Sequence, residues 1–391
     1  MSAEVSAGQV KAALATYFAV VGVLSPYLGL YMDSIGLNAS QIALLLALPQ
    51  ITRVFAPPFW GWLADKYSRP DLILKFSALA MMLSAIGLLL SGGSVSAISI
   101  ALLAFYLFSA AQMPLVEAYA IGVSKGHAGA YGDMRVWGSL GFVFAVVACG
   151  PFLDWAGRTT LPWVVAGISA ILFLSCMGYK PTKVAKASTS ATPISHILRK
   201  PEVSLLLASC TLHVFAHSAL YGFFSLFLAK QGFNGASIGA LWAVGVITEI
   251  VWFKVQQRFF QRLTSHFVIV CCAAVAAIRF GCLGAMNGMS IGWVEVLFIV
   301  ALQASHALTF AAHHTAIMNK MHEWFSQAQQ ARAQAFFVAV VYGAGGAAGT
   351  FVAGQLWAEV SPAWAFYGAA IASLLAFALA SIAAMGRFAK T

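Results

Sequence analysis

Residues 36–45 read GLNASQIALL, and residues 232–241 read GFNGASIGAL. The shared Gly, Asn, Ile and Leu are separated by the same 196 positions, about half of the 391-residue chain. Each segment follows the first long apolar stretch of its half and opens the second. Similarity at one fixed offset indicates an internal duplication, so we expect two halves of the same architecture.

The composition around these segments is that of a membrane protein. Hydrophobic residues make up 61% of the chain and charged residues 9%, and the mean hydropathy is +0.85. A soluble domain carries about 25% charge, so the composition excludes soluble enzymes, nucleic-acid binders and disordered scaffolds. Stretches of 18 or more mostly apolar residues lie near 12–33, 39–64, 72–91, 95–123, 134–153, 161–179, 203–229, 236–256, 266–286, 290–318, 333–357 and 362–386. We therefore expect an all-α membrane protein with twelve transmembrane helices.

The positive charges predict the orientation of these helices. If each apolar stretch crosses the membrane once, 18 Lys and Arg residues lie on the side of the N-terminus. Two, Arg158 and Lys230, lie on the opposite side. Cytoplasmic loops collect Lys and Arg, so we expect both termini in the cytoplasm. The net charge of +10 then needs no nucleic-acid partner. The first apolar stretch is too long for a cleavable signal and is expected to be retained.

The longest connection, about Lys180 to Pro201, is rich in Lys, Ser, Thr and Ala, which is a linker composition. We expect an N-terminal six-helix bundle over 1–179, a cytoplasmic linker over 180–201 and a C-terminal six-helix bundle over 202–391. The two bundles would be pseudo-symmetric about an axis along the membrane normal.

Motifs for chemistry are missing from the sequence. The six cysteines form no C-x-x-C pair, and there is no G-x-x-x-x-G-K-[ST] phosphate loop, nucleophile elbow or paired-carboxylate hydrolase motif. We expect no catalytic residues, no enzyme activity and no ATP-driven mechanism.

Four ionisable residues fall at membrane depth, Arg53, Glu117, Glu249 and Arg279, with Glu295 as a fifth candidate. A charge at the bilayer centre costs roughly 2.5–3.5 kcal/mol, so each implies a structural partner or a wet cavity on a transport path. The offset of 196 carries Arg53 onto Glu249, and we expect these two to face each other across a central cavity. It also carries Glu117 onto His313.

Histidines form two stripes within the apolar stretches, each on one helix face: His213, His217 and Tyr221 in the seventh, and Gln303, His306, Phe310 and His313 in the tenth. They could be satisfied core residues, but two stripes favour the lining of a cavity. A transition metal could bind an i, i+4 His pair together with Glu249. No loop carries a His- or Cys-rich tract, so we expect no metal site.

Two motifs resemble known families. Residues 61–66, GWLADK, ending at Arg69, resemble the signature loop of the major facilitator superfamily, although Tyr67-Ser68 stands where Gly is common and Pro70 follows. Residues 131–142, YGDMRVWGSLGF, resemble the Y-G-x-x-R-x-W-G-S-x-x-F element of the phenylpropionate permease family, proton symporters distantly similar to lactose permease. Further residues match that family in order: His217, Tyr221-Gly222-Phe223, Leu241-Trp242, Glu249, Arg279, Gln303, His306, Thr309-Phe310, His314 and Met318.

The resemblance covers nearly the whole chain and implies the major facilitator fold with alternating access. It implies proton-coupled symport of a small organic carboxylate, such as an aromatic acid, with the proton gradient as driving force and no cofactor. The substrate-binding residues would be Arg53, Arg279, His217, Tyr221, Gln303, His306 and His314. Glu249 and Glu117 would couple the proton, and Asp65, Arg69 and Arg135 would gate. The protein would be a monomer in the lipid bilayer of a bacterial inner membrane.

Two other functions stay open at this point. A carrier of the same fold could export a drug-like compound or move a metal chelate, sugar or nucleoside, and its histidines would then matter more than its arginines. The chain could also be a membrane receptor or scaffold that transports nothing. Proteoliposome assays with and without a proton gradient, over a panel of aromatic acids, sugars, nucleosides and metal chelates, distinguish these functions.

The charge asymmetry predicts that the central linker is cytoplasmic. A cysteine at Ser190, in a background without the native cysteines, is expected to react with an impermeant maleimide only from the cytoplasmic side. Labelling from outside in intact cells would contradict the orientation.

Overall fold

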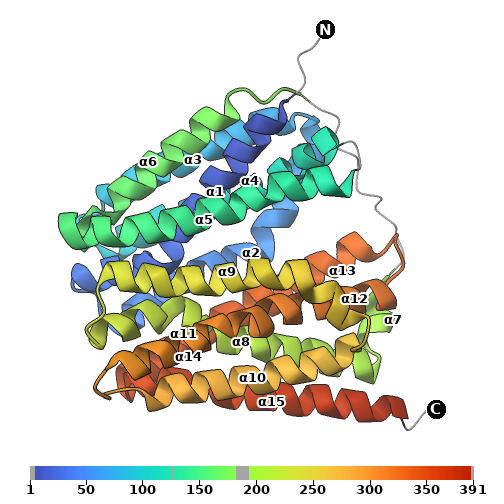
Figure 1. Ribbon diagram of the computed structural model, residues 1–391. Helices are drawn as coiled ribbons and strands as arrows, with labels where there is room; N and C mark the ends of the chain where they lie inside the picture. Colours follow the sequence, from blue (N-terminus) through green and yellow to red (C-terminus); the bar gives the residue numbers. More distant parts are fainter. Residues whose placement is uncertain (1–4, 125–126, 182–192, 389–391) are drawn as a thin grey trace. The chain divides into compact units, whose positions relative to one another are not determined.

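The computed structural model describes residues 5–124, 127–181 and 193–388, and all regular elements in these ranges are helices (Figure 1). Most of the predicted linker, residues 182–192, lies outside the described residues.

The prediction of twelve spans is confirmed, because the described part of the chain contains twelve helices of 19 to 32 residues that are apolar enough to cross a membrane. At about 1.5 Å per residue, each of them approaches or exceeds the roughly 30 Å of the hydrocarbon core. The first half contains α1 (Ala7–Ser34), α2 (Ala39–Tyr67), α3 (Pro70–Leu89), α4 (Val95–Ser124), α5 (Ala128–Ala156), the short η1 (Arg158–Thr160) and α6 (Leu161–Cys176). The second half contains the short α7 (Ser195–Leu198), then α8 (Pro201–Lys230), α9 (Gly235–Phe260), α10 (Ser265–Ala285) and α15 (Pro362–Phe388).

The tenth and eleventh spans are composite, which hydropathy did not predict. The tenth consists of α11 (Trp293–Ala304), a π-helical segment η2 (Ala307–Ala312) and α12 (His313–Trp324). The eleventh consists of α13 (Gln330–Phe337), the π-helical η3 (Val338–Gly345) and α14 (Gly346–Glu359). Glu295 lies in the first turn of α11, where it accepts a hydrogen bond from the Gly292 amide at 2.8 Å.

The repeated Gly-x-Asn segments are helix boundaries. Gly36 and Gly232 have φ angles of +85° and +89°, a left-handed conformation that glycine adopts at little cost. Two residues later, Asn38 accepts a hydrogen bond from the Gln41 amide at 2.9 Å, and Asn234 accepts one from the Ser237 amide at 2.8 Å. The repeat therefore encodes a turn followed by a capped second helix in each half.

The chain divides into two compact units, residues 1–186 with 233–240 and residues 187–232 with 241–391. The first turns of α9 thus belong with the first unit. Asp154 of α5 accepts hydrogen bonds there from the Gly235 and Ala236 amides at 2.7 and 2.9 Å. The bundle boundaries expected from the sequence, 1–179 and 202–391, stay a prediction.

Within the first unit, α1 packs on α5, and α3 packs on α4 and α6. The glycines of the 131–142 motif permit this packing. A Cβ atom on Gly141 would collide with the Ala15 backbone, and one on Gly138 would lie 2.7 Å from the Phe18 ring. Small residues at these positions let helix backbones approach closely.

Within the second unit, α8 packs against α14, η3 and α15, and α10 packs against α15, η2 and α12. In Figure 1, α8, α10, α14 and α15 run side by side. Gly349 lies against the Phe215 backbone, where no Cβ would fit. The glycines of the eleventh span therefore serve close helix packing.

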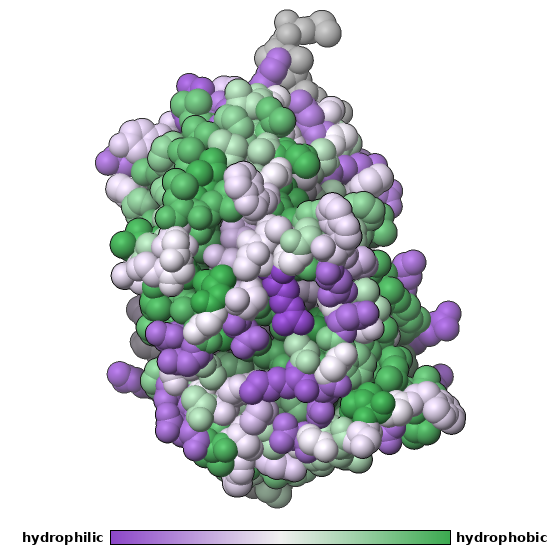
Figure 2. Space-filling model, turned by 90° about the vertical axis from the view of Figure 1, so that its left-hand side faces the viewer, coloured by the Kyte–Doolittle hydropathy of each residue, from purple (hydrophilic) through white to green (hydrophobic). Residues whose placement is uncertain are grey.

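Many large apolar side chains are exposed on the surface, and the face drawn in Figure 2 shows green hydrophobic areas between purple and white ones. Trp155, Phe144 and Trp293 are 83%, 75% and 74% exposed. So much exposed aromatic surface is unfavourable in water and suits a lipid environment.

Candidate substrate and proton site

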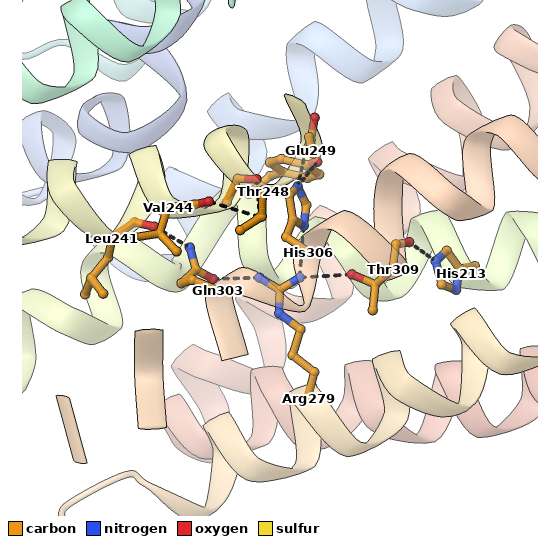
Figure 3. A network of polar contacts seen from close by, with 11 residues as sticks. His213, Leu241, Val244, Thr248, Glu249, Arg279, Gln303, His306 and Thr309 are labelled. Carbon is orange, nitrogen blue, oxygen red and sulfur yellow. Dashed lines mark hydrogen bonds and ion pairs between the residues drawn. The ribbon is translucent and has the colours of Figure 1, made fainter. Parts of the chain in front are cut away.

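The guanidinium of Arg279 lies at the centre of the second unit. Arg279 comes from α10 and is only 1% exposed. Its Nη1 donates to His306 Nδ1 at 2.9 Å and to Thr309 Oγ1 at 3.1 Å, and its Nη2 donates to Gln303 Oε1 at 2.6 Å (Figure 3). Its Nε–H is buried and has no hydrogen-bond partner among the described residues. The cation is thus held by neutral acceptors, which take three of its five N–H groups.

His306 connects this cation to Glu249. An arginine has only donors, so the Nδ1 of His306 accepts from Arg279 and must carry a lone pair. The proton of the neutral ring is then on Nε2, which lies 3.0 Å from Glu249 Oε1. Tyr221 Oη is 3.3 Å from the same nitrogen. The structure therefore orders Arg279, His306 and Glu249 as a chain of donors and acceptors.

Polar side chains and the backbone of the tenth span both contribute to the site. Gln303, near the end of α11, donates through Nε2 to the Leu241 carbonyl at 3.2 Å. Thr309, in η2, accepts from Arg279 through its hydroxyl and from His213 through its carbonyl, at 3.1 and 2.6 Å. A π-helical turn departs from the α-helical hydrogen-bond pattern, and such segments occur frequently at functional sites.

Aromatic rings lie next to His306. Phe310 stacks on the His306 ring at 5.3 Å, and Tyr221 meets both rings edge-on at 6.0 and 6.3 Å. His314 stacks on Phe310 at 6.4 Å and bonds the Tyr342 hydroxyl at 3.0 Å. The sequence predicted that His313 would follow His306 and Phe310 on one helix face. In the structure His314 stacks on Phe310 instead, and His313 stacks on His213. The π-helical turn between His306 and His313 accounts for this change of register.

The second unit thus brings together most of the substrate-binding residues expected from the sequence. Glu249, Arg279, Gln303, His306 and Tyr221 share one network of hydrogen bonds. His217 joins it by ring contact, 6.1 Å from His306. Within the described residues, no group of three or more His, Cys, Asp or Glu side chains is arranged to hold a metal ion.

In the first unit, Glu117 pairs with an arginine of the 131–142 motif. Its Oε1 lies 3.8 Å from Arg135 Nε and accepts from the Tyr131 hydroxyl at 3.4 Å. Both charged side chains are about one third exposed, so this pair is loose. Arg53 of α2 is exposed.

Arg69 of the signature loop makes a bidentate pair with Asp71, with distances of 3.0 and 3.1 Å, whereas Asp65 is exposed at the end of α2. The gating roles of Asp65, Arg69 and Arg135 stay predictions, as does the facing of Arg53 and Glu249.

Three residues that contact the predicted site residues were not themselves predicted from the sequence. Tyr131 and Thr309 are neutral and do not stand out from an apolar stretch by charge. Asp71 is buried, with 1% exposure. Its position directly after the Arg69-Pro70 pair was the available signal, because an acid in the first turn of a helix beside an arginine is a capping pattern.

Comparison with known proteins gives one family and several relatives. The model of the MFS_1 like family matches residues 9–368. The probable 3-phenylpropionic acid transporter of Escherichia coli (strain K12) is 26% identical over 349 residues, which cover 88% of this chain and 89% of that protein. Maltose permease of Geobacillus stearothermophilus is 24% identical over 333 residues, covering 79% and 82%. The crystal structure of the nucleoside transporter NupG matches with a TM-score of 0.80 at 17% identity, covering 96% of this chain and 98% of that one, and it confirms the predicted fold class.

The geometry predicts that Gln303 stabilises the second unit. Gln303→Leu removes the acceptor for Arg279 Nη2 and the donor for the Leu241 carbonyl, and leaves a buried cation with one bond fewer. A hydrogen bond to a charged group contributes about 1.5–3 kcal/mol, so we expect the free energy of unfolding to fall by about that amount. The measurement is thermal denaturation of the purified protein in detergent. Gln257→Leu, at an exposed position of α9, is the control and is expected to unfold like the wild type. Equal denaturation temperatures for all three proteins would contradict a stabilising role of Gln303.

Proposed function

Because this chain belongs to the MFS_1 like family, and so is a membrane transporter of the major facilitator type, we propose that it takes up a small organic carboxylate together with a proton. Proteins of this fold and family are transporters, not enzymes. The observation that carries the proposal is the Arg279–His306–Glu249 chain, in which a buried cation with an unpaired donor is linked to a carboxylate through one imidazole.

Arg279 is the proposed anion-binding residue. A guanidinium presents a planar fork that matches a carboxylate. Its Nη1 and Nη2 already donate to three side chains, so an incoming carboxylate that binds the Nη1–Nη2 edge of the guanidinium would replace at least one of these acceptors, His306 on Nη1 in this proposal. The aromatic rings of Tyr221 and Phe310 lie next to His306 and suit a substrate with an aromatic part. The name of the E. coli relative refers to an aromatic carboxylic acid, which supports this substrate class.

The charge balance of the site couples substrate binding to proton binding. The substrate-free site holds one cation, Arg279, and one anion, Glu249, so it is neutral. A carboxylate that replaces His306 at Arg279 adds one negative charge and frees the Nδ1 lone pair of His306. The His306–Glu249 pair can then bind one proton, which restores neutrality. Since an uncompensated charge at membrane depth costs roughly 2.5–3.5 kcal/mol, the site favours loading both ions or neither.

The remaining expectations belong to the same proposal. Arg53 and Glu117 of the first unit would contribute to the transport path. The protein would act in a bacterial inner membrane as a monomer with cytoplasmic termini, and it would use the proton gradient without a cofactor. A neutral sugar or nucleoside, the substrate classes named for maltose permease and NupG, would give the buried cation no anion to bind.

Glu249→Gln is expected to uncouple transport from protons. The amide still accepts a hydrogen bond from His306 Nε2 but cannot bind a proton. With one proton per substrate, a gradient of about one pH unit sustains about tenfold accumulation in wild-type proteoliposomes. The variant is expected to equilibrate its substrate without accumulation and to retain measurable exchange.

Glu359→Gln, at the exposed end of α14, is the matched control and should accumulate substrate normally. Accumulation by Glu249→Gln with a normal pH profile would place the proton site elsewhere, and Glu117→Gln would be the next variant to measure.

Arg279→Lys is expected to keep the charge and lose most of the affinity for a carboxylate substrate. An ammonium cannot make two parallel hydrogen bonds to a carboxylate, and the lost contact is worth about 1.5–3 kcal/mol, or about 10–150-fold in affinity. Arg258→Lys, at an exposed position near the end of α9, is the control. Substrate affinity is measured together with the amount of protein in the membrane.

Normal affinity in well-expressed Arg279→Lys would exclude the anion-binding role. A purely structural role of the pair predicts a different pattern: Arg279→Ala and Glu249→Ala would each reduce the protein in the membrane, and the double variant would restore it.

A further inference from the structure

A row of buried imidazoles leads away from the Glu249–His306 pair. His217 lies 6.1 Å from His306 between ring centroids, and His213 lies 4.5 Å from His217. The ring of His313 stacks on that of His213 at 4.0 Å with an interplanar angle of 13°. His217, His213 and His313 are between 2% and 4% exposed. Four imidazoles from two spans therefore form a continuous series.

The hydrogen bonds fix the protonation of two of these rings. His213 Nε2 donates to the Thr309 carbonyl at 2.6 Å, so its Nδ1 carries the lone pair. His217 Nδ1 donates to the His213 carbonyl at 2.8 Å, so its Nε2 carries the lone pair. These two lone-pair nitrogens, and Nε2 of His313, are buried and have no hydrogen-bond partner among the described residues.

Packing alone does not account for this series. A buried polar atom without a hydrogen bond costs about 1–3 kcal/mol, and an apolar ring would fill the same space without that cost. Buried polar groups of this kind are normally bridged by ordered water. An unpaired imidazole nitrogen beside water can accept a proton from it.

The row runs toward one end of the second unit. His217 and His213 are 16 and 12 residues from Pro201, the first residue of α8, which corresponds to about 24 and 18 Å along the helix. His306 and His313 are 18 and 11 residues from Trp324, the end of α12. The end where α8 begins is the one that the positive charges predict to be cytoplasmic.

Charged and titratable groups face the row from the neighbouring elements. They are Arg279 on α10, Glu249 on α9, His306 directly before η2, and His314 on α12, which bonds Tyr342 of η3. Arg279 is a permanent cation, so the row is expected to hold one additional proton at a time.

We propose that His217, His213 and His313 carry the coupling proton between the Glu249–His306 pair and the cytoplasmic end of the second unit. This role rests on the proposed proton symport. The proton leaves the Glu249 carboxyl group, which becomes a carboxylate, and binds the lone pair of a ring nitrogen, which makes that ring an imidazolium. Water bridges the rings and accepts the proton at the cytoplasmic end, and no electrons are transferred.

The test separates proton movement from substrate movement in proteoliposomes. Substrate-driven proton flux is followed with an entrapped pH dye, and substrate counterflow is measured in parallel, for the wild type, His213→Gln and His313→Gln. A positioned side chain accelerates proton transfer by about 10²–10⁴-fold, so we expect the proton flux to fall at least about tenfold while counterflow persists. Free imidazole added to His213→Ala is expected to restore the flux.

His266→Gln is the matched control. His266 is a buried histidine in the first turn of α10 that bonds the Ala380 carbonyl through Nε2 at 2.8 Å, as His213 bonds Thr309. Its substitution is expected to leave the proton flux at the wild-type level.

The outcomes are distinguishable. If the wild type moves substrate without protons, proton symport itself is wrong. If the wild type moves both and the two Gln variants keep the wild-type proton flux, the row is not the proton path and symport stands. An equal loss of flux and counterflow, without rescue by imidazole, would make the histidines structural and overturn the proposal. Should His213→Gln fail to fold, the proton flux of His313→Gln decides.

Discussion

The second unit depends on one constraint, which is that the buried guanidinium of Arg279 must be satisfied without a carboxylate in direct contact. Its three hydrogen-bond acceptors are Gln303, His306 and Thr309, all from the tenth span. Removing acceptors from a buried cation is far more destabilising than removing a surface ion pair, so these contacts fix the tenth span against α10. Glu249 balances the charge from a distance, through His306, and can change its protonation without breaking a direct ion pair with Arg279.

The tenth and eleventh spans both have irregular backbone in the second unit, and that of the tenth span contributes to the contacts of Arg279. The π-helical η2 presents the hydroxyl of Thr309 to Arg279 and the carbonyl of the same residue to His213. Across α8, the π-helical η3 leads into α14, where Gly349 contacts the Phe215 backbone and Ser218 donates to the Gly346 carbonyl at 3.0 Å. This close packing holds α8, and with it His213 and His217, beside the polar residues of the tenth span. The π-helical segments η2 and η3 thus both lie beside polar side chains of the second unit.

The fold could be predicted from the sequence because the length of an apolar stretch is a local property. The Gly-x-Asn repeat added the division into halves, since a left-handed glycine and an asparagine cap define a boundary by themselves. Helix ends were less predictable: the tenth span was expected to end near residue 318, but the helix continues to Trp324 through polar residues that include a Lys320–Glu323 pair. The participants of the site were predictable as charges and histidines in apolar surroundings. Three features were not predictable, because they depend on contacts between helices that are distant in the sequence. They are the tautomer of His306, the indirect link between Arg279 and Glu249, and the π-helical turns.

On the proposed function, the indirect link also explains why a single imidazole lies between the cation and the anion. A direct ion pair of Arg279 with Glu249 would hold both charges in their most stable states, and a substrate carboxylate would compete with Glu249 for the same fork. With His306 between Arg279 and Glu249, the substrate carboxylate displaces the neutral His306 ring from Arg279. This costs less electrostatic energy than displacing the Glu249 anion. The freed ring stays hydrogen-bonded to Glu249, so arrival of the substrate at one end of the chain changes the proton affinity at the other. Binding and protonation are thereby coupled through one side chain, and reciprocity requires that protonation in turn favours the bound anion.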